Sequence, residues 1–207
     1  QNLPEVPITD LVIKDDDLVI ATQGRSFWVL DDLTLLHQYS DSVYDQKLFL
    51  FRPRTTWAFQ SGKNENLRNA GENPLPGVVV NYYLKEKPHK SDSITLRFLD
   101  SNLASIKSFK QFPLSGDEKL SLKQGMNQIN WNMLYPEADK FEGMLTWNGN
   151  GGNPAAPPGK YFVSMSLGKD SVIKEFTIKK PGNVQASDED LQAKFMFLIR
   201  CRDKLSE

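Results

Sequence analysis

The residues best suited to bind a ligand lie in a loop rich in glycine and asparagine, at positions 142–153. An indole such as that of Trp147 can stack on the apolar face of a sugar, and the amides of Asn148 and Asn150 can hydrogen-bond its hydroxyl groups. Carbohydrate contact is therefore one hypothesis for this loop. The alternative is that Trp147 covers the end of a hydrophobic core and that the glycines only make turns.

The carboxylates of the chain do not predict a catalytic set. Asp31 and Asp32 are adjacent where an expected strand ends, and adjacent strand residues point to opposite faces, so they cannot act together as the paired acids of a glycosidase. They are expected to hydrogen-bond a turn instead. The acidic run at 15–17 lacks the ligand spacing and the final Glu of an EF-hand loop, so it too predicts a turn. Motifs for phosphate, dinucleotide, zinc-protease or serine-hydrolase chemistry do not occur, and we predict no catalytic residue.

Metal-binding and redox-active residues are scarce. The chain has two histidines, His37 and His89, far apart in sequence, and one cysteine, Cys201. An intrachain disulfide, a thiolate zinc site and a multi-histidine metal site within the chain are thereby excluded. We predict neither a metal nor a cofactor. Cys201 lies in an apolar helical stretch, so it is expected to be buried and unreactive.

Charge and hydropathy give no reason to expect nucleic acid or a membrane as partner. The chain of 207 residues has 25 basic and 26 acidic side chains, which are scattered without a basic stripe. No stretch approaches the roughly 20 apolar residues of a membrane span. Residues 1–20 lack the basic start and apolar core of a signal peptide.

The elements that would position these side chains are mostly strands. Four runs, at 78–84, 94–99, 126–131 and 161–167, are apolar, rich in β-branched and aromatic residues, and bounded by turn formers. In the second run, Ile94, Leu96 and Phe98 alternate with polar residues, which predicts one buried and one wet face. With the weaker runs between them, they predict an Ig/fibronectin-like β-sandwich and an all-β fold class.

The two ends of the chain have their own patterns. Three short strands are expected at 8–13, 17–22 and 26–30, joined by tight turns, with Gly24 suited to a positive φ. Such a meander is too small to bury a core alone. At the other end, Ser187 is a good N-cap and Asp190 completes a variant of the capping box, which predicts a helix over 188–204 with an apolar stripe.

Both β-rich regions resemble one protein family. Residues 7–33, and above all Gly-Arg-Ser-Phe-Trp-Val-Leu-Asp-Asp at 24–32, resemble the end of the last blade of a sortilin-like or BNR-repeat β-propeller. Residues 74–180 resemble the FlgD-type Ig-like domain that follows the propeller in that family, whose members are often described as glycosyl hydrolases or exo-sialidase-like. Since a propeller needs at least about four blades, this chain would hold less than one blade of it.

The resemblance implies a domain order and a location. Residues 1–46 would be a partial last propeller blade, 47–76 a connecting strand and linker, 77–180 an Ig-like β-sandwich, and 187–205 a C-terminal helix. The protein would be secreted or periplasmic.

The resemblance also implies a function and its alternative. The chain would be a non-catalytic accessory or interaction domain that binds glycan or protein. Its partners would be the upstream propeller blades, a carbohydrate, another protein, or a second copy joined through the partial blade. Alternatively, it is a fragment of an exo-sialidase-like glycoside hydrolase whose catalytic residues lie mainly in other blades. Sialidase sites gather several arginines that bind carboxylate bidentately, and this chain supplies only Arg25 from its blade.

Overall fold

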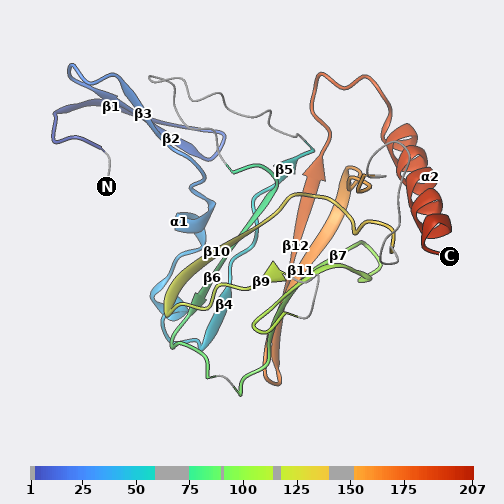
Figure 1. Cartoon of the computed structure of the whole chain (residues 1–207). Coiled ribbons are helices and arrows are strands. Elements are labelled where there is room, and N and C mark those ends of the chain that lie inside the picture. The colour runs from blue at the N-terminus through green and yellow to red at the C-terminus, as the bar shows by residue number, and fades with distance from the viewer. Residues whose placement is uncertain (1–2, 59–74, 90, 114–117, 140–151) are drawn as a thin grey trace. The chain divides into compact units, whose positions relative to one another are not determined.

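A computed structural model describes residues 3–58, 75–89, 91–113, 118–139 and 152–207. The chain divides into two compact units, residues 1–43 and 44–207, and each unit is described by itself. The described residues are mostly strands, followed by one long C-terminal helix (Figure 1), as the sequence predicts.

The first unit is built on a three-stranded antiparallel sheet. Strands β1 (Ile8–Lys14), β2 (Asp17–Thr22) and β3 (Phe27–Leu30) follow one another in the sheet in chain order. Lys14 pairs with Asp17, so the turn between β1 and β2 has two central residues, Asp15 and Asp16, with φ of 50° and 67°. Positive φ at both positions is the mark of a type I′ hairpin turn, whose twist matches that of the strands.

Two short helical segments follow this sheet in the first unit. Helix α1 (Thr34–Gln38) and the 3-10 helix η1 (Asp41–Val43) occupy the region before the second unit. Asp32, which has a φ of 62°, accepts hydrogen bonds at Oδ1 from the backbone nitrogen of Thr34 (3.1 Å) and from its hydroxyl group. β3 ends at Leu30, so the prediction that Asp31 and Asp32 have the alternating geometry of a strand is wrong, but the carboxylate of Asp32 holds the turn into α1 as expected.

The second unit contains two further sheets. One has the order β10-β6-β4, and the other has the order β5-β12-β11-β7-β8-β9. Neighbours pair antiparallel except for β5 with β12 and β8 with β9. β4 and β5 lie within residues 47–76, and each pairs with a strand from later in the chain. The strands are β4 (Leu48–Leu50), β5 (Thr56–Trp57), β6 (Val78–Leu84), β7 (Ile94–Leu99), β8 (Ser105–Lys110), β9 (Glu118–Lys119), β10 (Gly125–Trp131), β11 (Gly159–Leu167) and β12 (Asp170–Lys179).

Both sheets of the second unit contribute to one hydrophobic core. β7 shows the expected alternation, since Ile94, Leu96 and Phe98 are buried while Arg97 is exposed. Trp131, at the end of β10, is fully buried, and its ring centroid lies 4.9 Å from that of Phe98 on β7. Because β10 and β7 belong to different sheets, this aromatic contact joins the two.

Helix α2 (Asp188–Ser206) begins with the capping box that the sequence predicts. The Ser187 hydroxyl oxygen accepts a hydrogen bond from the backbone nitrogen of Asp190 (3.0 Å), and the Asp190 carboxylate accepts one from the backbone nitrogen of Ser187 (3.2 Å). Phe195 is the one buried residue of the helix. Its ring lies 4.7 Å from that of Tyr135, which follows β10.

Replacing Ser187 with alanine is expected to lower the free energy of unfolding by about 1 kcal/mol, because the Asp190 amide loses its acceptor. Ser187→Thr is the matched control, since threonine keeps a hydroxyl group at the N-cap that can accept from the Asp190 amide and donate to its carboxylate, and should change stability by only a few tenths of a kcal/mol. Urea denaturation followed by far-UV circular dichroism measures both. Equal losses in the two variants would contradict a capping role.

The prediction that Cys201 is buried is wrong, because its side chain is exposed. The helix packs through the side that carries Phe195. At 3.6 residues per turn, Cys201 lies about 120° around the helix axis from Phe195, away from that contact. Apolar neighbours in the sequence did not define which side of the helix is covered.

Candidate functional site

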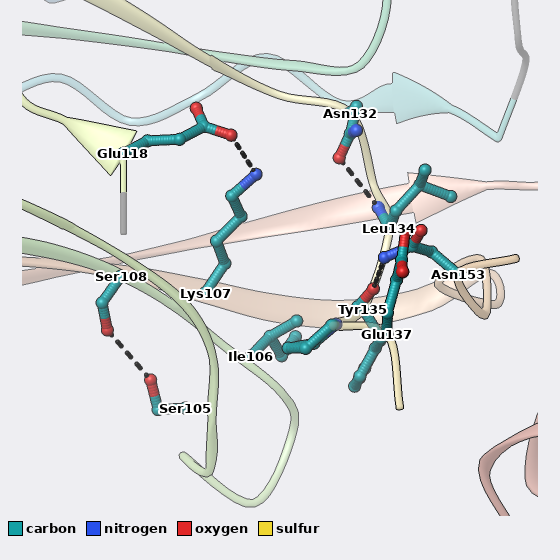
Figure 2. Close-up of a pocket in the computed structure, with 11 residues that line it drawn as sticks. Ser105, Ile106, Lys107, Ser108, Glu118, Asn132, Leu134, Tyr135, Glu137 and Asn153 are labelled. Atoms are coloured by element: carbon teal, nitrogen blue, oxygen red, sulfur yellow. Dashed lines mark hydrogen bonds and ion pairs between the residues drawn. The ribbon is translucent and has the colours of Figure 1, made fainter. Parts of the chain in front are cut away.

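An open pocket of about 480 Å³ lies between strands β8 and β9 on one side and residues 132–137, which follow β10, on the other (Figure 2). β8 and β9 end the larger sheet, and β10 is an edge strand of the smaller one. The pocket therefore opens where the margins of the two sheets part. Its lining is mixed, with lysine, carboxylate, amide and hydroxyl groups beside the apolar side chains of Ile106, Leu134 and Pro136.

A bulge in β8 brings Lys107 into this pocket. Ser105 pairs with Leu99 and Lys107 pairs with Phe98, so Ile106 has no partner of its own on β7. Directly paired residues share a face of the sheet, and Phe98 is a fully buried core residue. Lys107 thus lies on the core-facing side of β8, at the margin of the core.

The ammonium group of Lys107 is held by two contacts. Its Nζ lies 2.6 Å from a carboxylate oxygen of Glu118 on β9 and 5.3 Å from the ring centroid of Phe109. The Lys107 side chain is 26% exposed and that of Glu118 is 58% exposed. Lysines are rarely withdrawn from water without a paired charge, and Glu118 provides one for this partly buried lysine.

The opposite wall is fixed by backbone hydrogen bonds. The backbone nitrogen of Tyr135 donates to the carbonyl of Pro154 (2.8 Å), and Leu134 bridges to Ala155. Asn153 Nδ2 donates to the carbonyl of Tyr135 (2.8 Å). These bonds hold residues 134–135 against residues 153–155, so the wall is preorganised rather than a free loop.

Two asparagines present unused polar atoms on that wall. Asn132 accepts a hydrogen bond at Oδ1 from the backbone nitrogen of Leu134 (3.2 Å), while Asn153 uses its Nδ2. The Nδ2 of Asn132 and the Oδ1 of Asn153 thus remain available to a ligand. With Lys107 counted against Glu118 and Glu137, the ionisable side chains of the lining sum to a net charge of −1. The pocket therefore offers both donors and acceptors without an excess of positive charge.

Tyr135 connects this wall to the core and to α2. Burial is the main cause that raises the pKa of Tyr135 to about 12, and the charge of Asp100 acts in the same direction. A hydrogen bond with Tyr161 and the charge of Arg202 on α2 act in the opposite direction. Burial likewise raises the pKa of Tyr161 and of Tyr82.

These tyrosines are expected to ionise at a higher pH in the folded chain than in the unfolded chain. A raised pKa means that the folded state favours the protonated phenol, so its contribution to stability is complete below pH 10 and is lost as the pH rises toward 12. Absorbance of tyrosinate, followed against pH with and without urea, measures this. Tyr135→Phe should remove one phenol from the part of the titration at high pH and leave the rest of the curve unchanged. A native titration curve that coincides with the curve in urea would contradict the prediction.

A second pocket of about 530 Å³ is a weaker candidate. Its described lining holds lysines and His89 beside as many carboxylates but no amide or hydroxyl side chain, so it lacks the neutral polar groups of the first pocket. Among the described residues, no group of three or more metal-ligating side chains is close enough to hold an ion. The pocket near β8 and β9 is therefore the better candidate for a binding site.

The sequence-predicted site residues do not lie in this pocket. Trp147, Asn148 and Asn150 lie outside the described residues, so the prediction of a carbohydrate-binding loop there stays untested. Arg25 is exposed in the turn between β2 and β3, and its carbonyl accepts a hydrogen bond from Trp28 Nε1 (3.0 Å).

Sequence reasoning missed the pocket itself, although one signal was present. Ile106 and Phe109 both read as inward residues, yet they are three positions apart, which strict alternation along a strand does not allow. That spacing indicates a bulge, and a bulge turns a neighbouring side chain toward the core. Lys107 is the neighbour that it turns.

Comparison with known proteins identifies no relative: no family model, no curated protein and no solved structure matches the chain. Within the described part of the chain, none of the helices is long and apolar enough to cross a membrane.

Proposed function

We propose that this chain is the C-terminal region of a secreted or periplasmic propeller protein of the sortilin-like or BNR-repeat kind, and that its own role is non-catalytic. In this proposal, β1–β3 belong to the last blade and residues 77–180 form a FlgD-type Ig-like β-sandwich. The chain acts as an accessory module that docks on the propeller and offers an interaction surface.

The exposed apolar residues of β1–β3 are the observation that carries this proposal. Leu11, Val12 and Ile13 are consecutive in β1 and 55–61% exposed. Successive strand residues point to opposite faces, so this sheet presents apolar side chains on both. On β3, Phe27 is 73% exposed, and Val29 and Leu30 are about half exposed. Contiguous exposed apolar surface marks a binding surface, and a propeller blade packs against a neighbour on each face.

The second unit supports the Ig-like part of the proposal. Its two sheets contribute to one core, and Trp131 is buried between aromatic residues of the facing sheet. Most strand pairs are antiparallel, as in Ig-like sandwiches. The parallel pairs involve only the two-residue strands β5 and β9, which lie at the ends of the larger sheet.

Extending the chain with its upstream coding sequence tests the proposal. We expect that sequence to encode repeated four-stranded blade patterns. We also expect the longer protein to protect the amides of β1–β3 from hydrogen exchange more strongly than the 207-residue chain does. Amides of β6 and β11 serve as the internal control and should exchange equally in both. An upstream sequence without blade repeats, or unchanged exchange in β1–β3, would overturn the propeller assignment.

The non-catalytic role has a separate assay. We expect the 207-residue chain to leave aryl sialosides and other aryl glycosides intact, because Arg25 alone does not make a sialidase site. Hydrolysis by the purified chain that Arg25→Ala abolishes would instead favour the glycoside hydrolase alternative. Light scattering on the same sample shows whether the isolated chain is a monomer or associates with a second copy.

A further inference from the structure

We propose that the pocket between β8, β9 and residues 132–137 binds a neutral saccharide. The groups that would hold it are the ammonium of Lys107, the Nδ2 of Asn132 and the Oδ1 of Asn153. All the residues that line this pocket belong to the second unit, so the inference does not rest on the assignment of β1–β3 to a propeller blade.

The size and preorganisation of the pocket suit a small ligand. Its volume of about 480 Å³ falls within the roughly 300–1,000 Å³ of small-molecule sites. One wall is fixed by the hydrogen bonds of residues 134–135 to residues 153–155. The other wall belongs to β8, which is paired along its length with β7. Neither wall has to become ordered when a ligand enters, which lowers the entropic cost of binding.

The polar groups suit hydroxyl groups rather than ions. A sugar hydroxyl is both a donor and an acceptor, and the pocket offers donors from Lys107 and Asn132 beside the acceptor oxygen of Asn153. Figure 2 shows Lys107 and Glu118 on one side of the pocket and the two asparagines on the other. The lining also includes Ile106, Leu134 and Pro136, whose apolar side chains offer surface to the C–H face of a sugar ring.

The charged groups of the pocket favour a neutral sugar over an acidic one. The ammonium group of Lys107, the one cation among the described lining residues, already lies 2.6 Å from the Glu118 carboxylate. Among the described lining residues, no other cation offsets the repulsion between Glu118 and the carboxylate of an acidic sugar. The pocket is thus expected to prefer a neutral sugar over the corresponding uronic or sialic acid.

Lys107 has one competing explanation. Natural sheets use inward-pointing charges to prevent unwanted pairing at their edges, and among the described residues only the two of β9 pair with the outer side of β8. A lysine that served this purpose alone would affect aggregation and leave saccharide binding unchanged. The test must therefore separate the two roles.

Titration of the isotope-labelled 207-residue chain with saccharides, followed by amide NMR, tests the inference. The panel holds glucose, galactose, mannose, N-acetylglucosamine and their β-linked disaccharides, with glucuronic and N-acetylneuraminic acid as acidic counterparts. We expect saturable shifts at residues 105–108 and 132–135 with at least one neutral sugar, and weaker binding of its acidic counterpart. No shifts with any neutral sugar, shifts confined to other residues, or tighter binding of the acid would overturn it.

Two variants with matched controls identify the groups involved. Asn132→Asp keeps the Oδ1 acceptor for the Leu134 amide but loses the Nδ2 donor, so affinity should fall about tenfold. Asn102→Asp adds the same charge in an exposed turn outside the pocket and should leave affinity within about twofold. Lys107→Met should also weaken binding about tenfold or more, while Lys110→Met on the same strand should not.

The variants can either support saccharide binding in this pocket or contradict it. If Lys107→Met and Asn132→Asp bind the sugar as the original chain does, the inference is wrong, and Lys107 is left with protection of the sheet edge. Should Lys107→Met fail to fold, the isosteric Asn132→Asp variant still decides the question. Loss of binding in these variants would support the inference even if hydrogen exchange argued against a propeller, so the two proposals can fail separately.

Discussion

Replacing Trp131 with alanine is expected to lower the free energy of unfolding by about 3–5 kcal/mol. The side chain is fully buried, and its ring centroid lies 4.9 Å from that of Phe98, 6.0 Å from Tyr161 and 6.5 Å from Phe176. Alanine would leave a cavity among these rings, and close-packed neighbours relax only partly into such a space. Urea denaturation followed by circular dichroism measures the loss.

Two further variants separate the causes of that loss. Trp131→Phe keeps an aromatic ring but loses the hydrogen bond from Nε1 to the carbonyl of Leu134 (3.0 Å), so it should cost about 1–3 kcal/mol. Trp57→Ala is the matched control for removal of an indole, because Trp57 is 54% exposed on the short strand β5. It should cost less than about 1 kcal/mol. Similar losses for Trp57→Ala and Trp131→Ala would contradict the central place of Trp131 in the core.

The long strands and α2 could be predicted because their signals are local. Ile94, Leu96 and Phe98 alternate with polar residues, and one face of a strand must be buried for such a pattern to arise. Ser187 and Asp190 carry the capping chemistry within four residues of chain, so the start of α2 is fixed by its own sequence.

The elements that were missed depend on distant residues. β5 and β9 are two residues long, too short for any periodicity, and each exists only because it pairs with a neighbouring strand. The exposure of Cys201 follows from which side of α2 meets Tyr135, and nothing in the helix sequence specifies Tyr135.

The candidate site also depends on residues that are distant in the sequence. Its two walls come from β8 and β9 on one side and from residues 132–137 and 153 on the other, and only the sheet topology brings them together. The bulge at Ile106 could have been suspected from the spacing of inward residues. Its consequence for Lys107 depended on the partner strand, because the pairing with Phe98 decides which way the lysine points.

Replacing Gly77 with alanine is the second change with a large expected effect, a loss of about 3 kcal/mol or more. Gly77 has a φ of 91°, a conformation that residues with a Cβ rarely adopt. A Cβ built there would lie 2.2 Å from the carbonyl oxygen of Trp131 and 3.0 Å from its carbonyl carbon. These are backbone atoms, so no side-chain rotation can relieve the overlap.

The overlap between a Cβ at position 77 and the Trp131 carbonyl is costly because it lies where β6 pairs with β10. Val78, the next residue, begins β6 and pairs with Trp131 at the end of β10. Moving the Trp131 carbonyl away would strain this pair and shift the indole that fills the core. Gly77→Ala should therefore resemble a weaker form of Trp131→Ala, with changed shifts for the Trp131 indole proton in NMR spectra.

Gly168→Ala measures the cost of backbone strain in the absence of an atomic overlap. Gly168 also has a positive φ, 60°, but no heavy atom lies within 4 Å of its built Cβ. Alanine there should cost only the roughly 1–2 kcal/mol of the left-handed conformation. The difference between the two variants in urea denaturation then measures the contact with Trp131. Equal losses at Gly77 and Gly168 would mean that β6 and β10 separate at this end at little cost, so the Val78–Trp131 pair would not be a rigid point of the core.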